Sequence, residues 1–130
     1  MSAQPGRAFT NAPGRRLRRY PRYRSSFPVL VTLLAAGRYE RLDAHCKDLS
    51  AAGIGVLLAA ELAFGEVVSL NFTLPGSPHP WEIHGVLRHR RGYHYGFEFL
   101  SLSREQGGFL RQHIQGLERA DFELDLTPPK

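Results

Sequence analysis

The sequence predicts an all-β fold with one helix, in which a six-stranded antiparallel β-barrel is followed by a C-terminal α-helix. Short runs rich in β-branched and aromatic residues recur at hairpin-like spacing and are separated by turn residues. Apolar residues at helical spacing occur once, after the last of these runs. Because strands do not alternate with crossover helices, a doubly wound parallel sheet is not expected. The length of 130 residues fits a single domain.

Six runs carry the strand pattern. The clearest alternation runs from Val68 to Leu74, where apolar residues take every second position and Ser69, Asn71 and Thr73 separate them. Glycine and proline residues bound the runs, as expected of hairpin turns. The predicted barrel covers residues 27–100. Its strands are residues 27–36, 40–49, 53–59, 68–74, 81–88 and 95–99.

The helix is predicted over residues 103–117. Ser103 is a candidate N-cap and Gln106 follows three residues later, which is the Ser-x-x-Gln form of a capping box. Two consecutive glycines inside this segment cost about 1 kcal/mol each relative to alanine, so the helix must be stabilised by docking on the barrel. The apolar residues that would form the docking stripe are Phe109, Leu110, Ile114 and Leu117.

The charge of the chain is concentrated near its start. The formal net charge is +5, and residues 1–26 contain seven arginines but no acidic residue. Residues 1–14 are rich in Gly, Pro and Ala and are expected to be disordered. Residues 15–24 form an arginine-rich arm, which Pro21 disfavours as a helix and which is therefore expected to be extended. Residues 120–130 are expected to be a flexible tail. Such asymmetry indicates an anionic partner: nucleic acid, a membrane surface or a phosphorylated ligand.

Several classes of protein are disfavoured by what the sequence contains. Cys46 is the single cysteine, which excludes an intramolecular disulfide and a thiolate zinc site. No apolar run approaches 18 residues and the start lacks the apolar core of a signal peptide, so a cytoplasmic protein without membrane insertion is expected. No Ser/His/Asp set, phosphate-binding glycine loop or paired-acid spacing supports catalysis. We therefore expect no enzyme activity, no metal and no cofactor.

Two arginines of the arm have the spacing of a ligand clamp. Arg18 and Arg22 lie four residues apart, which is about 13 Å in extended chain with both side chains on one face. Arginine binds phosphate and the O6/N7 edge of guanine with two hydrogen bonds. Tyr20 and Tyr23 could stack on a base. The alternative is a solvated basic tail, or a tether that binds nucleic-acid phosphates without sequence preference.

A second polar cluster, which we call the polar turn, comprises Asp48, Ser50 and Gly53. Asp48 can accept from the paired N–H donors of a guanine edge, Ser50 can donate or accept, and Gly53 would let a ligand approach the backbone. The alternative is an ordinary turn in which Asp48 and Ser50 bind local N–H groups.

Taken together, Arg18-x-x-x-Arg22 and Asp48-x-Ser50-x-x-Gly53 resemble the PilZ domain, the bacterial receptor module for cyclic di-GMP. The resemblance extends from about residue 15 to residue 117 and includes a later Gly96-Phe97-Glu98-Phe99 ending. It implies a PilZ-like barrel with a C-terminal helix over residues 15–119, the same fold that the periodicity predicts.

The resemblance also implies the ligand-binding residues. These are Arg18, Arg22, Asp48, Ser50 and Gly53, with Arg19 as an additional phosphate contact. The chain would then be a non-catalytic receptor that changes the surface seen by an unidentified downstream protein, and it would bind no specific nucleic acid. Two alternatives stay open: a nucleic-acid-binding module that uses the arm, and a PilZ-like adaptor that acts by protein contact alone.

Other polar and aromatic residues are assigned to the scaffold. His84, His89 and His94 are interpreted as surface positions of strands, because no carboxylate lies at a ligand-like offset. Trp81 is expected in the core or at the barrel rim. None of these residues is included in the predicted site.

Overall fold

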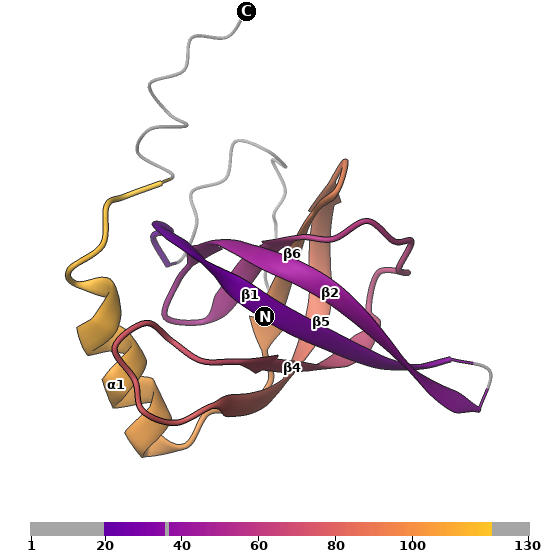
Figure 1. The fold of residues 1–130 in the computed structure, drawn as a ribbon. Helices are drawn as coiled ribbons and strands as arrows, with labels where there is room; N and C mark the ends of the chain where they lie inside the picture. The colour runs from indigo at the N-terminus through magenta and orange to yellow at the C-terminus, as the bar shows by residue number, and fades with distance from the viewer. Residues whose placement is uncertain (1–19, 36, 121–130) are drawn as a thin grey trace, which may run out of the picture.

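The computed structural model describes residues 20–35 and 37–120, and in this part of the chain it contains six strands and one helix (Figure 1). The prediction of an all-β barrel with a C-terminal helix is confirmed. No helix within these residues has the length and apolarity needed to cross a bilayer. The elements are β1 (Tyr23–Ala35), β2 (Arg38–Leu49), β3 (Gly53–Leu57), β4 (Val67–Phe72), β5 (Trp81–Arg91), β6 (His94–Phe99) and α1 (Arg104–Ile114).

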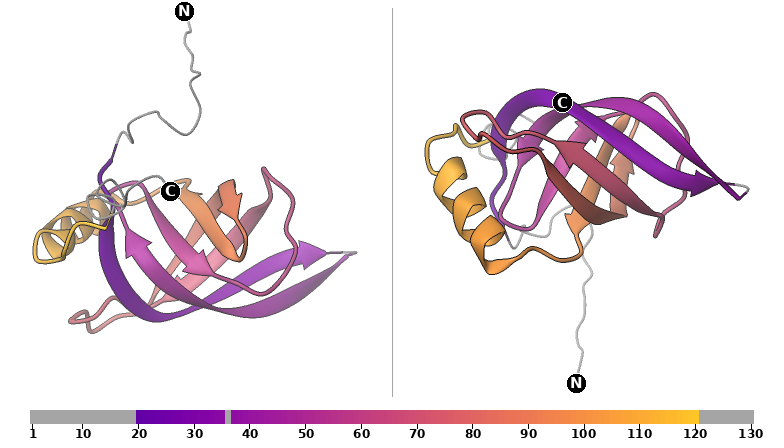
Figure 2. Two further views of the ribbon diagram at one scale, coloured as in Figure 1. Left: turned by 90° about the horizontal axis from the view of Figure 1, so that it is seen from above. Right: turned by 60° about the horizontal axis from the view of Figure 1, so that its bottom comes forward.

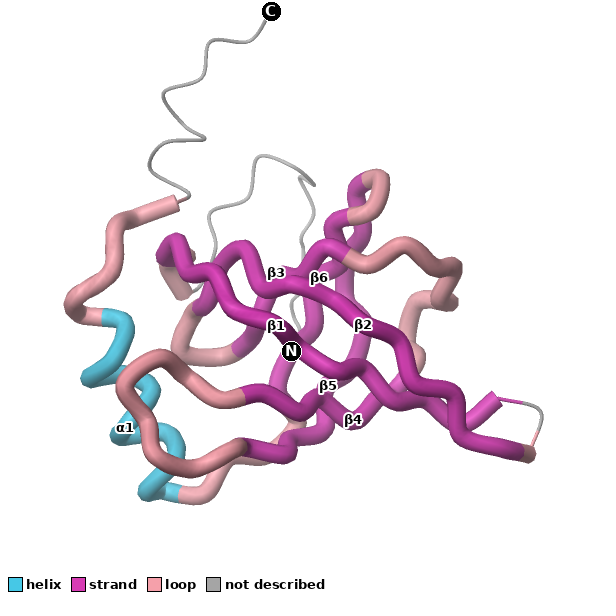
Figure 3. The backbone as a smooth tube through the Cα atoms, in the orientation of Figure 1, coloured by secondary structure: helices cyan, strands magenta, loops and turns pink. Residues whose placement is uncertain are grey.

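The six strands close into one antiparallel barrel in the order β1-β2-β3-β6-β5-β4. Closure is made between β1 and β4, which pair over Leu30–Thr32. The ladder between β1 and β2 is much longer and continues to the pair Ala35 and Arg38. The β1–β2 ribbon therefore extends beyond the barrel wall, as the tube drawing shows (Figure 3).

Alternate residues of each strand point into the barrel, as the period-2 pattern predicts. In β4, for example, Val68, Leu70 and Phe72 are buried while Ser69 and Asn71 are partly exposed. A chain of aromatic contacts leads from this core to the helix, with ring centroids 5.5–5.9 Å apart at each step. Its members, in order of contact, are Phe27, Phe72, Trp81 and Phe109.

The helix α1 covers one end of the barrel, and the free tip of the β1–β2 ribbon lies at the other (Figure 2). Leu110 and Ile114 are the buried residues of α1 and join the barrel core, so the expected docking is observed. The predicted capping box is also present: Ser103 Oγ accepts from the Gln106 backbone N–H, and the Gln106 side chain accepts from the Ser103 N–H. The helix ends three residues before the predicted boundary at Leu117.

The first strand starts earlier than the sequence predicts. β1 begins at Tyr23 instead of residue 27, so the end of the predicted arm is part of the sheet. One edge of this extension pairs with β2, where Arg24 lies opposite Asp48. Its other edge pairs with the segment after α1, because the Arg24 N–H donates to the Glu118 carbonyl at 2.7 Å and the Ala120 N–H donates to the Arg22 carbonyl at 2.9 Å. The start of β1 is thus held on both sides.

Replacing Ser103 with alanine should lower the free energy of unfolding by about 1 kcal/mol, because the N-cap hydrogen bond to the first turn of α1 is lost. Urea denaturation followed by circular dichroism measures this change. Ser101→Ala is a matched control, since Ser101 is exposed and its side chain makes no hydrogen bond within residues 20–35 and 37–120. An equal loss in both variants would contradict a specific capping role.

Candidate functional site

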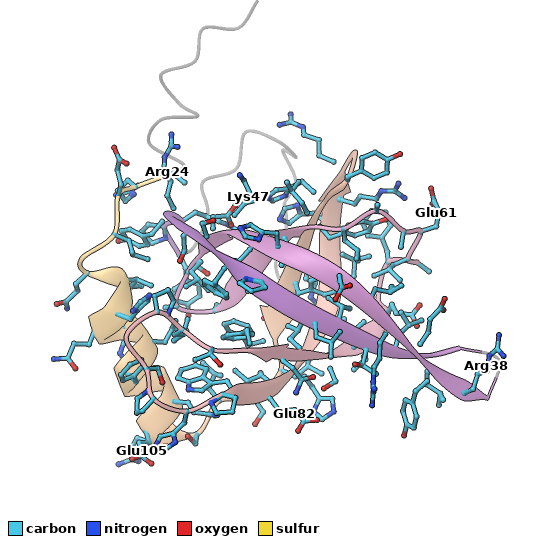
Figure 4. The ribbon with its side chains drawn as sticks, in the orientation of Figure 1. Arg24, Arg38, Lys47, Glu61, Glu82 and Glu105 are labelled. Atoms are coloured by element: carbon cyan, nitrogen blue, oxygen red, sulfur yellow. The ribbon has the colours of Figure 1, made fainter. Side chains whose placement is uncertain are left out.

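An ion pair joins the arginine-rich arm to the polar turn. Arg22 lies just before β1, and its Nη1 atom donates to Asp48 Oδ1 near the end of β2 at 2.5 Å. Each of the two side chains is only 13% exposed. The backbone places them together, because Arg24 and Asp48 are cross-strand partners. Lys47, beside Asp48, lies on the same edge of the molecule as Arg24, far from Arg38 at the ribbon tip (Figure 4).

Two glycines form a floor beneath this pair on the outer wall of the barrel. Gly55 of β3 and Gly96 of β6 are cross-strand partners, and their chain neighbours point into the core. The Asp48 carboxylate lies over the first glycine, because a Cβ atom at Gly55 would lie 2.5 Å from Asp48 Oδ1. The ring of His89 lies over the second, because a Cβ atom at Gly96 would overlap His89 Nε2. We call Gly55 and Gly96 the glycine floor.

The Arg22 guanidinium spans the two side chains that lie on the glycine floor. Its Nη1 binds Asp48, and its Nη2 lies 3.2 Å from His89 Nε2. A second histidine binds the other carboxylate oxygen, with 3.1 Å between His94 Nε2 and Asp48 Oδ2. The two imidazole rings are stacked with centroids 6.2 Å apart. Arg22, Asp48, His89 and His94 therefore form one connected polar network.

The network keeps Asp48 ionised. Burial raises the pKa of the Asp48 carboxyl, but the hydrogen bond from His94 and the charge and hydrogen bond of Arg22 outweigh burial, so its pKa lies below the ordinary value.

The neighbouring thiol of Cys46 behaves differently. Burial, and then the charge of Asp48, raise the pKa of Cys46 well above its usual range. Cys46 is fully buried and its Sγ donates to the Asp48 carbonyl at 3.4 Å, so it is a packed residue of the core.

Ser50 and Gly53 shape the turn that follows Asp48. Ser50 is 4% exposed; its Oγ accepts from the Ala52 N–H at 3.1 Å and its N–H donates to the Gly53 carbonyl at 2.9 Å. A Cβ atom at Gly53 would overlap the Phe97 carbonyl oxygen of β6. Cross-strand packing therefore requires glycine here, independently of any ligand.

The structure brings together part of the predicted site. Arg22 and Asp48 are in direct contact, and Ser50 and Gly53 lie in the adjoining turn. Arg18 and Arg19 lie outside the described residues. Of the two tyrosines considered for stacking, Tyr20 is 44% exposed, whereas Tyr23 already has the Arg119 guanidinium 5.8 Å from its ring centroid.

All three histidines occupy outward strand positions, as interpreted, but two of them also contact residues of the predicted site. His84 is exposed, as expected, but His89 and His94 contact Arg22 and Asp48. Asp48 is far from both histidines in the sequence, and it meets His94 only because β2 is joined to β6 through β3. The available signal was the glycine pair, Gly55 and Gly96, at outward positions of two strands whose inward residues are apolar. In the described part of the chain, no group of three or more His, Cys, Asp or Glu side chains is arranged to hold a metal ion.

Asp48→Asn should reveal the contribution of the ionised carboxylate to stability. The pKa of Asp48 is lowered from an ordinary value of 3.8, so its stabilisation is present above that value and is lost as the pH falls through the folded-state pKa. We expect the variant to be less stable than wild type near pH 7, by about 2 kcal/mol, because Arg22 keeps its buried charge without a counter-ion.

This difference in the free energy of unfolding between wild type and Asp48→Asn should become smaller below about pH 4. Urea denaturation of both proteins near neutral pH and in acid tests this expectation. Asp43→Asn is the matched control, an exposed carboxylate on the same strand, and should show little change at either pH. A loss of stability in Asp48→Asn that does not depend on pH would contradict the claim that the ionised carboxylate stabilises the fold.

Comparisons with known proteins agree with this fold. The sequence model of the PilZ domain matches residues 16–117. No curated protein sequence is significantly similar to the chain. The structure of the PilZ domain of YcgR from Escherichia coli with c-di-GMP is 22% identical, with a TM-score of 0.58, and the match covers 84% of this chain and 95% of that one.

Two longer proteins are also similar. The Bacillus subtilis inhibitor of motility, MotI/DgrA, is 20% identical with a TM-score of 0.59, over 85% of this chain and 53% of that one. YcgR from Escherichia coli in complex with c-di-GMP is 26% identical with a TM-score of 0.56, over 83% of this chain and 46% of that one. This chain thus spans about half of each longer protein. The family match covers most of its length, and the chain belongs to the PilZ domain family.

Proposed function

We propose that this chain is a non-catalytic receptor for cyclic di-GMP. The observation that carries the proposal is the ion pair between Arg22 and Asp48, which unites the arm and the polar turn on the outer wall of the barrel. Membership of the PilZ family supports it, as do the two similar YcgR structures that contain c-di-GMP.

The polar groups of the site suit a guanine base and a phosphate. Asp48 is ionised, and each carboxylate oxygen retains a lone pair beyond its contact with Arg22 or His94, so both can accept from the N–H donors of a guanine edge. The Arg22 guanidinium has further N–H donors for phosphate or for guanine O6 and N7. In this proposal Arg18 binds the far end of the ligand, Arg19 adds a phosphate contact, and Ser50 and Gly53 form the wall beside Asp48.

The proposal includes a route from ligand to partner protein. Arg22 is the last arm residue before β1, and its carbonyl is bound by Ala120 after α1. A ligand that gathers the rest of the arm over Asp48 therefore changes the surface where the arm and the segment after α1 meet. A downstream protein would recognise this altered surface.

Isothermal titration calorimetry with cyclic di-GMP tests the receptor function. We expect saturable binding at micromolar or tighter affinity, and a loss of about 10-fold or more for Arg22→Ala and for Asp48→Ala, because each removes a charged hydrogen-bonding group. Arg41→Ala and Asp43→Ala are matched controls on the exposed face of β2 and should bind like wild type. Absence of saturation by wild type at moderate salt would overturn the proposal.

The same variants distinguish the nucleic-acid alternative. A module that binds phosphates through the arm would bind arbitrary DNA with a steep dependence on salt and would not respond to Asp48→Ala. The receptor proposed here requires the opposite pattern: weak binding to arbitrary DNA and a strong response to Asp48→Ala.

A further inference from the structure

His89 belongs to neither of the two sequence motifs, yet it contacts the central arginine of the site. It lies on β5, on the far side of the glycine floor from Asp48. Its Nε2 atom is 3.2 Å from Arg22 Nη2. The ring can lie flat there only because its cross-strand partner, Gly96, has no side chain.

The chemistry of the contact fixes the state of the imidazole. A guanidinium has N–H donors and no acceptor, so a hydrogen bond between Arg22 Nη2 and His89 Nε2 requires Nε2 to be the acceptor. A neutral imidazole with its proton on Nδ1 meets this requirement, and an imidazolium does not. His94 has the opposite role, because a carboxylate accepts only and His94 Nε2 must donate to Asp48 Oδ2.

We propose that His89 is a positioning residue of the ligand site, which acts as a neutral hydrogen-bond acceptor for Arg22. The inference rests on the proposed receptor function and names a residue that the family motifs do not contain. Asp48 holds one Nη group and His89 holds the other, so the guanidinium is fixed across the glycine floor. A single anchor would leave the planar group free to rotate about that contact.

This second anchor matters for affinity because of preorganisation. Arg22 is at the root of a long basic segment, and an arginine side chain loses considerable rotamer freedom when a ligand immobilises it. The contact with His89 removes much of this freedom before the ligand arrives. Among the described residues, Arg22 Nη2 lies 3.2 Å from His89 Nε2, and the ring of His94 on β6 lies 6.2 Å from the His89 ring between centroids. His94 in turn binds Asp48.

Binding of cyclic di-GMP by three variants tests the proposal by calorimetry. His89→Leu removes the acceptor and should weaken binding about 10-fold, whereas His89→Gln supplies an amide oxygen and should stay within about threefold of wild type. His84→Leu, at an exposed position of the same strand, is the matched control and should not change affinity. Equal losses in His89→Leu and His89→Gln would overturn the proposal, because packing and not hydrogen bonding would then explain the effect.

A double-mutant cycle isolates the pair. In an Arg22→Ala background, His89→Leu should have no further effect on affinity, because its partner is already absent. A further loss of the same size in that background would also overturn the proposal.

A measurement without ligand separates this inference from the proposed function. Nitrogen-15 NMR of the histidine rings in the unliganded protein should show His89 Nε2 without a proton, and the preference for this tautomer should fall in Arg22→Ala. A proton on His89 Nε2 in wild type would overturn the inference. If wild type does not bind cyclic di-GMP but shows the expected tautomer, the receptor function fails while the contact between His89 and Arg22 stands.

Discussion

The site depends on the absence of side chains at two facing positions, Gly55 and Gly96. The two glycines are adjacent on the outer wall. Asp48 from β2 and the ring of His89 from β5 can therefore both lie flat on the same face of the sheet. A methyl group at either position would displace the polar side chain above it. Arg22 then bridges the gap between the two. The barrel order supplies the geometry, because the β3–β6 pair stands between β2 and β5.

This arrangement explains why the family motifs are separated in sequence. Arg22 and Asp48 are 26 residues apart, and a long antiparallel ribbon folds them back onto one another. Because the root of the arm is held between β2 and the residues after α1, the arginine approaches the floor from a fixed direction. The segment after α1 therefore supports the site through its backbone, and no side chain of α1 belongs to the polar network.

The sequence predicted what depends on local pattern. Alternating apolar residues predicted the strands, and Ser103 with Gln106 predicted the start of α1. The resemblance to the PilZ domain placed Arg22 and Asp48 in one predicted site, and the two side chains are in contact. Features that depend on register between distant strands were not predicted. His89 meets Arg22 through the ladders that link β2, β3, β6 and β5, and residues 118–120 meet β1 without any repeat or motif that marks the pairing.

The two ends of the described barrel are adjacent, because Tyr23 and Arg119 are paired in a β-bridge. A domain whose two ends lie so close can be inserted into a surface loop of another protein with little distortion of its host. This barrel is therefore suited to insertion into a fluorescent host protein, whose emission would report the ligand binding at Arg22 that is proposed above. The same geometry makes a circularly permuted form practicable, with a short linker joining the two ends and new termini opened at the distant ribbon tip near Arg38.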